Sequence, residues 1–332
     1  MRIVLAGVAL LAIVWGGYWF VGARAVESNT KAWFAARNGG AITASHAGID
    51  VGGFPNRFDL KVSAPLVYDS TSRSGWQAPE FKVYALSYRP NHLIAVWPDT
   101  QRLQLNGEML DISSDDLRAS LVLRGGTALD IDRITLVGNA MELRSDRGWQ
   151  AAAQTLRLAS RKVGDESALH EIALELLDLS PDPAWRAGVD PRGLQPARID
   201  GLRLDMRVAF DAPLNRHGAA GGTPPRPTAV DLRDLRLVWG ELMLRGEGRL
   251  EFDGHGIPEG KITLEAENWR AMLDLAVAAE FVHPEAAETW SRGLQVLEDH
   301  GGREGVLEVP LHFSNGQMRL GALPLGPAPR LP

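Results

Sequence analysis

Cysteine is absent from the 332-residue chain, and this absence removes several kinds of chemistry at once. Without thiols the protein has no disulfide bond, no thiolate nucleophile, no cysteine-ligated zinc and no iron–sulfur cluster. The stability of the fold must therefore come from burial of apolar side chains and from backbone hydrogen bonding.

Long runs of positive charge are also missing. The formal net charge is −6, and no run of basic residues exceeds the dipeptide Arg161-Lys162. Proteins that bind nucleic acid cluster basic side chains to neutralise phosphates. The composition therefore predicts no nucleic-acid partner.

The sequence contains no GxSxG elbow, no Walker loop and no GxGxxG fingerprint. Its eight histidines include no pair at metal-ligand spacing, and His170-Glu171 is not followed by the second histidine of a zincin motif. The pairs Asp115-Asp116 and Asp130-x-Asp132 lie on alternating or turn segments, which is typical of solvated faces. We predict no catalytic residues, no metal, no cofactor and no enzymatic activity. A hydrolase site assembled from distant strands stays open as an alternative.

What the chain does contain is a charge-free run of 21 residues from Ile3 to Ala23. At about 1.5 Å per residue, such a helix reaches roughly 30 Å, the thickness of the hydrocarbon core of a bilayer. The run predicts one transmembrane helix within a membrane anchor of residues 1–25. At its far end, three aromatic residues are candidates for the membrane interface, where such rings favour the headgroup layer: Trp15, Tyr18 and Trp19.

The same run can be interpreted as a cleavable signal peptide, because Ala23-Arg24-Ala25 has the small-x-small pattern that signal peptidase requires. The apolar stretch exceeds the usual length of a signal peptide core, which favours the anchor. Either interpretation places the rest of the chain on the outer side of the membrane.

Residues 26–40 predict an amphipathic connecting helix. Val26, Thr30, Trp33 and Phe34 share one helical face, and Gly39-Gly40 then ends the pattern. The pattern favours an arrangement in which Trp33 and Phe34 cover one end of the core. The alternative is that both lie on the membrane surface, which makes them further candidates for the membrane interface.

From residue 41 the apolar period changes from helical to two, as in Phe58–Ser63 and Phe81–Tyr88. The fold class predicted is mainly β: a large, curved antiparallel sheet, a meander that can be groove-like, with a few helices behind the anchor. Two of these helices are expected at Trp269–Phe281 and Pro284–Asp299. The β-rich domain covers 41–332, with candidate halves 41–197 and 198–332, and a flexible loop at 212–228.

Three runs resemble a known family. Gly17–Val21, the GGFPNRFDL run at Gly52–Leu60 and the YRPNH run at Tyr88–His92 are similar to DUF2125. The resemblance covers nearly the whole chain and implies an alphaproteobacterial envelope protein with one N-terminal membrane segment. It implies a single-pass inner-membrane protein whose bulk lies in the periplasm, and it implies no activity.

A weaker similarity, at the level of pattern, is to AsmA-type periplasmic β-rich proteins. It lies in Gly246–Ala266 and in Asn315–Gly321. Some of those proteins are thought to bridge lipid across the envelope, so this resemblance implies contact with lipid.

Within the YRPNH run, Arg89 and His92 are candidate contacts for a partner or for a headgroup phosphate. The alternative is a structural turn, because Pro90 restricts Arg89 to extended geometry and Asn91 favours a turn.

Together these patterns predict a non-enzymatic, membrane-anchored periplasmic protein that binds or conducts lipid on an apolar sheet face. Its expected partners are membrane lipid and other envelope proteins. The alternative is a structural or interaction module of a cell-envelope complex. Alternation alone does not tell an open groove from a closed core.

Overall fold

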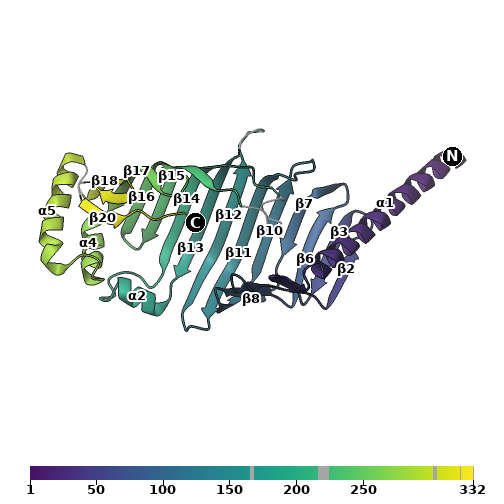
Figure 1. Cartoon of the computed structure of the whole chain (residues 1–332), viewed down its shortest axis with the longest axis horizontal. Helices are drawn as coiled ribbons and strands as arrows, with labels where there is room; N and C mark the ends of the chain where they lie inside the picture. Colours follow the sequence, from purple (N-terminus) through teal and green to yellow (C-terminus); the bar gives the residue numbers. More distant parts are fainter. Residues whose placement is uncertain (165–167, 216–223, 302–304, 322, 332) are drawn as a thin grey trace. The chain divides into compact units, whose positions relative to one another are not determined.

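The computed structural model describes residues 1–164, 168–215, 224–301, 305–321 and 323–331. The predicted fold class is confirmed: antiparallel strands dominate, a few helices accompany them, and a long apolar helix begins the chain (Figure 1). Two compact units divide the chain, and each is described by itself. The first comprises Met1–Gly125 and Ile134–Gly148, and the second comprises Gly126–Arg133 and Trp149–Pro332. This division differs in position from the boundary at 197/198 that the sequence suggested.

The first unit begins with helix α1, Arg2–Ala35. The sequence pattern suggested an anchor and a separate connecting helix, whereas α1 is continuous through both. No glycine or proline lies between Gly22 and Gly39, and Lys31 pairs with Glu27 one turn earlier at 2.5 Å. Nothing between the two patterns breaks the backbone hydrogen bonding.

The strands of the first unit form two antiparallel rows, in which each strand pairs with the next one named. One row is β2 (Gly48–Gly52), β3 (Arg57–Ser63), β6 (Glu80–Leu86), β7 (Arg89–Val96) and β10 (Asp116–Leu123). The other is β1 (Ile42–Ser45), β4 (Leu66–Asp69), β5 (Ser74–Gln77), β8 (Thr100–Leu105), β9 (Glu108–Ser113) and β11 (Ile131–Ser145). The C-terminal half of α1 packs on β2 and β3.

The second unit is a meander in which each strand pairs with the next strand along the chain. Its strands are β12 (Gln150–Lys162), β13 (Leu169–Ser180), β14 (Ile199–Phe210), β15 (Pro227–Trp239), β16 (Leu242–Phe252), β17 (Pro258–Glu267), β18 (Val306–Ser314), β19 (Gln317–Leu320) and β20 (Leu323–Pro327). Short turns suffice for antiparallel neighbours: Asn315 and Gly316 join β18 to β19 with φ of 53° and 69°, as a type I′ hairpin requires.

In the described part of the chain, three helices interrupt this meander. Helix α2 (Pro183–Val189) follows β13, and the side chain of Asp182 caps it by accepting from the backbone N–H groups of Ala184 and Trp185. Helices α4 (Trp269–Ala278) and α5 (Pro284–Gly301) follow β17, which confirms the two predicted helices. Of the predicted loop at 212–228, residues 216–223 lie outside the described part, and β15 begins at its last two residues.

Candidate functional site

One face of the second unit's sheet carries two apolar rows that cross seven strands. Directly paired residues share a face of an antiparallel sheet, so the register defines rows of side chains that run across the strands. One row is Leu158, Leu174, Leu204, Leu235, Gly246, Leu264 and Val309. The next row is Leu156, Leu176, Leu202, Leu237, Leu244, Ala266 and Leu307. We call this surface the leucine face.

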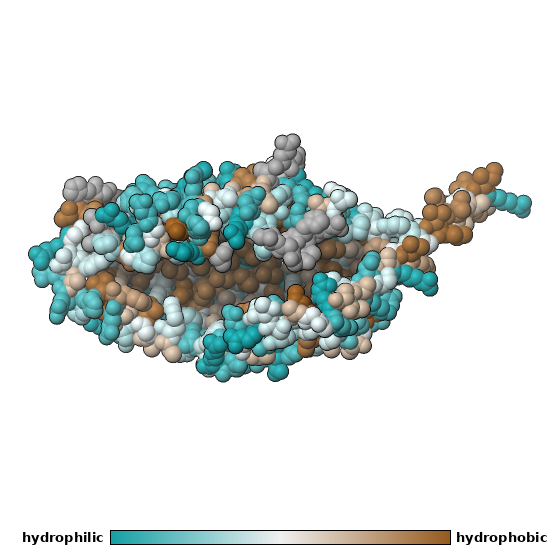
Figure 2. Space-filling model, in the orientation of Figure 1, coloured by the Kyte–Doolittle hydropathy of each residue, from teal (hydrophilic) through white to brown (hydrophobic). Residues whose placement is uncertain are grey.

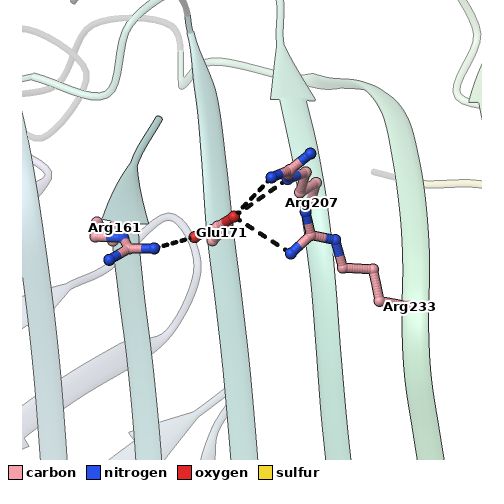
Figure 3. Close-up of polar contacts among 4 residues, drawn as sticks. All are labelled: Arg161, Glu171, Arg207 and Arg233. Atoms are coloured by element: carbon pink, nitrogen blue, oxygen red, sulfur yellow. Dashed lines mark hydrogen bonds and ion pairs between the residues drawn. The ribbon is translucent and has the colours of Figure 1, made fainter. Parts of the chain in front are cut away.

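The opposite face of the same strands is charged. Glu171 on β13 accepts from Arg161 on β12 and from Arg207 on β14, and Arg233 on β15 lies 3.3 Å away (Figure 3). Hydrogen bonds from Arg161, and then from Arg207, lower the pKa of Glu171 from 4.5 to about 2. The side chains of Arg161, Arg207 and Arg233 are 62%, 39% and 35% exposed, so this ladder of ion pairs lies on a solvent-accessible face.

Two helices cover the leucine face over β16 to β18. Trp269 of α4 and Leu294 of α5 form a buried cluster with Ala266, Leu307 and Val309. Trp269 is only 2% exposed, and Leu307 and Val309 are 4% and 3% exposed. This part of the leucine face is a closed core.

Over β12 to β15 the same rows are half-buried, as Leu158, Leu174, Leu204 and Leu235 show. None of these four leucines belongs to the buried core clusters of the described residues. Figure 2 shows a hollow over these strands, with a brown apolar floor and teal polar rims. The uncovered part of the leucine face is therefore open.

In the first unit, three aromatic side chains of α1 hydrogen-bond to backbone carbonyls of two loops. Trp15 Nε1 donates to Pro55 O at 3.1 Å, and Trp19 Nε1 donates to Arg57 O at 2.5 Å. Tyr18 Oη donates to Ser87 O at 2.7 Å. The bonds reach across 38 to 69 positions of sequence, and we call the two loops, 53–57 and 87–88, the helix socket.

Glycine allows α1 to approach this socket closely. A Cβ on Gly22 would lie 2.5 Å from the Phe58 ring, whereas a Cβ on Gly17 would meet nothing within 4 Å. Phe58 itself is buried with Trp19 and Ala23. One side of α1 thus docks on β3, and the other side does not.

The N-terminal part of α1 leaves its apolar side chains exposed. They include Ile3 (88%), Leu11 (70%) and Val21 (72%). Among the described residues, α1 is the one helix long and apolar enough to span a membrane.

The five predicted interface aromatics have different surroundings. Trp15, Tyr18 and Trp33 are 37%, 46% and 41% exposed, and Arg37 stacks on the Trp33 ring at 3.9 Å. Trp19 and Phe34 are buried at 5% and 8%. Phe34 packs with Ala44, Ile49 and Val62, which corresponds to the arrangement that the sequence favours for this residue.

The structure does not bring Arg89 and His92 together in one polar contact. Arg89 begins β7 and is exposed, whereas His92 Nε2 lies 3.0 Å from Ser120 Oγ on β10. Between them, Asn91 Nδ2 donates to Leu123 O at 2.8 Å. The YRPNH run therefore joins the ends of β7 and β10.

Several other carboxyl groups lie in ion pairs or accept hydrogen bonds from backbone N–H groups. The pKa of Glu298 is lowered, first by Arg270 and then by the backbone N–H of Gly305. Asp182 and Asp253 also have lowered pKa values, because backbone N–H groups donate to them. Within the described part of the chain, no group of three or more His, Asp or Glu side chains could hold a metal ion.

Sequence reasoning missed the helix socket. The GGFPNRFDL run at Gly52–Leu60 supported the family resemblance, yet it gave no sign that this segment receives Trp15 and Trp19. The only available signal was three aromatic donors within five residues of an apolar helix, because the acceptors are main-chain carbonyls that any residue supplies.

These features define a class of protein: an antiparallel β protein with an N-terminal helix long and apolar enough to span a membrane. The chain belongs to the DUF2125 family, described as an uncharacterized protein conserved in bacteria, whose family model matches residues 19–329. No curated protein and no solved structure matches the chain. The weaker similarity to AsmA-type proteins stays a prediction.

Proposed function

We propose that the protein is a single-pass, membrane-anchored periplasmic protein that holds or conducts lipid acyl chains on the open leucine face. It is not an enzyme in this proposal. The observation that supports it is a sheet face with two apolar rows across seven strands. Helices seal these rows over β16 to β18, whereas over β12 to β15 the leucines of the rows are only half-buried. An extended apolar surface that helices do not cover is typical of a binding site.

The size of the open surface suits acyl chains. Four neighbouring strands at about 4.8 Å spacing span roughly 14 Å, close to the ~15 Å thickness of one leaflet's hydrocarbon. Burial of each methylene contributes about 0.8 kcal/mol. The surface discriminates little between apolar chains, because the rows that form it consist almost entirely of leucine.

The titratable groups support binding rather than catalysis. Each shifted carboxyl group has a pKa below its ordinary value because arginine, lysine, serine or backbone N–H groups stabilise its ionised form. Groups that exchange protons near neutral pH need the opposite kind of shift for a carboxyl.

A matched pair of variants tests lipid binding. Leu174 lies on the leucine face of β13, and its neighbour Ala173 is exposed on the charged face. The full chain is reconstituted in vesicles with a phospholipid that carries a diazirine on its acyl chain, illuminated, and digested for mass spectrometry. The adducts on residues 3–21 of α1 serve as an internal standard for membrane insertion.

We expect lipid adducts on β12 to β15 in the wild type and in Ala173→Lys. In Leu174→Lys these adducts should fall relative to the α1 standard, because an ammonium group disfavours the burial of acyl chains. Equal adducts in the two variants, or adducts on α1 alone in the wild type, would refute lipid binding. Protein–protein crosslinks at this surface would instead indicate an interaction module of an envelope complex.

A further inference from the structure

The side of α1 that is turned away from the sheet determines how deep the helix must lie in a bilayer. Its exposed apolar residues run from Ile3 to Val21, and the next charged residue, Arg24, is exposed. At about 1.5 Å rise per residue the distance from Ile3 to Val21 is roughly 27 Å, close to the ~30 Å of the hydrocarbon core. Hydrocarbon must therefore reach the level of Val21.

The helix socket contacts α1 closer to the N-terminus than Val21, and therefore deeper in the bilayer than the end of the apolar run. Trp15 and Tyr18, which bond to Pro55 and Ser87, precede Val21 in the helix. The step from Trp15 to Val21 is about 9 Å along the axis at ~1.5 Å per residue. The socket therefore lies alongside a part of α1 whose other side is in lipid.

Several backbone groups of the socket have hydrogen-bond partners, as lipid requires of backbone groups within it: Gly53 O, Pro55 O, Asn56 O, Arg57 N, Ser87 N and Ser87 O. Pro55 O accepts from Trp15 Nε1 and from Ser87 Oγ at 3.4 Å, and Pro55 has no N–H to satisfy. Ser87 N donates to Asn56 O, and Arg57 N donates to Gly53 O, both at 2.9 Å. The two loops therefore bond to each other and to α1.

Two aromatic side chains lie on the outside of the socket, beside the exposed Asn56 and an exposed Arg57 that pairs with Asp59. Phe54 and Tyr88 are 56% and 58% exposed. Phe54 packs edge-on against Trp19 at 5.3 Å and stacks with Phe20 of α1 at 5.7 Å between ring centroids. Aromatic rings of this kind favour the headgroup layer of a membrane.

From this geometry we propose that the helix socket is immersed in the bilayer leaflet nearest the sheet, with Phe54 and Tyr88 in contact with phospholipid. The inference rests on the proposed membrane anchoring and adds a second lipid contact to it. Strand β3 begins within the socket at Arg57, and strand β6 ends at Leu86, directly before the socket residue Ser87. Acyl chains therefore meet the first unit's sheet without crossing water.

Single-cysteine labelling tests this immersion, because the natural chain has no cysteine. We would attach an environment-sensitive NBD group to Phe54→Cys and to Tyr88→Cys in the full chain, in phosphatidylcholine–phosphatidylglycerol vesicles. Quenching by a nitroxide placed high on the lipid acyl chain reports contact with lipid. Both positions are exposed, so that either variant should fold, and thermal unfolding of each checks this.

Two further cysteine positions serve as controls, one expected in lipid and one expected in water. Val8→Cys lies on the exposed part of the anchor. Ser70→Cys lies beyond the other end of α1, because Ser70 N donates to Ala41 O at 2.9 Å. The Val8 probe should be quenched and the Ser70 probe should not.

We expect blue-shifted emission and strong nitroxide quenching at Phe54 and at Tyr88. Immersion is refuted if both probes behave like the Ser70 probe while the Val8 probe is quenched, or if they are shielded from water without being quenched by lipid. An unquenched Val8 probe would instead refute the anchoring itself, so the two failures are distinguishable.

Discussion

The open part and the helix-covered part of the leucine face have the same sequence pattern and different surroundings. Leu202 on β14 and Leu307 on β18 belong to one cross-strand row. Leu307 is 4% exposed beneath α4 and α5, whereas Leu202 is half-buried on the open part. Alternation therefore determines which face is apolar, and a distant element determines whether that face is closed.

The largest expected difference between the covered and the open part is the loss of stability on truncating a leucine to alanine. Leu307→Ala should lower the free energy of unfolding by about 3 kcal/mol, because it leaves a cavity in a closed core. Leu202→Ala should cost only about 1 kcal/mol, because part of its side chain already faces the hollow. Urea unfolding of the full chain in detergent measures both variants. Equal losses would contradict the open surface.

Helix α1 repeats the comparison on a smaller scale, with one side docked and one side free. Gly22→Ala should destabilise the docked helix by about 1–3 kcal/mol, since the new methyl group overlaps the buried Phe58 ring. Gly17→Ala is the control, because its Cβ meets nothing and alanine favours the helix. Thermal unfolding in detergent compares them. A similar transition temperature for the two variants would show that α1 does not dock on β3 as described.

The smallest expected effect is on the pH dependence of stability, and it comes from Glu171 on the charged face of the sheet, opposite the open part of the leucine face. The folded-state pKa of Glu171 is about 2, against 4.5 for the free group. Its ionised form therefore stabilises the fold above pH 4.5, and this contribution is lost as the pH falls toward 2. Glu171→Gln should be less stable than the wild type at pH 7 and less sensitive to acid between pH 4.5 and 2.

The control for this variant is Glu251→Gln. Glu251 pairs with Arg249, and both side chains are about two-thirds exposed, so the pair contributes little. Urea midpoints across this pH range should match the wild type for Glu251→Gln. If Glu171→Gln gave the same acid profile as the wild type, the ladder of ion pairs would not stabilise the sheet.

Much of the architecture could be predicted from short-range pattern. The period of two indicated the strands, the charge-free run indicated the apolar helix, and Pro284 marked the start of α5. Each of these signals is local, because it depends on residues within a few positions of one another.

The rest depends on contacts that local pattern does not encode. Whether Leu202 or Leu307 is covered depends on helices inserted between β17 and β18. Trp19, a candidate for the membrane interface, and Phe34, a candidate for either the interface or the core, are buried because α1 continues onto the sheet. Likewise, the acceptors for Trp15 and Tyr18 are backbone carbonyls 40 and 69 positions away.

The openness of the leucine face can be measured as the rate at which single cysteines on it react with an apolar maleimide. Leu204→Cys, on the open part, should react nearly as fast as Asp205→Cys on the charged face, and added phospholipid should slow only the former. Val309→Cys, in the same row as Leu204 but beneath the helices, should react about 100-fold more slowly, since it must wait for local opening. Leu204→Cys reacting as slowly as Val309→Cys would show a sealed core and would contradict an open lipid-binding face.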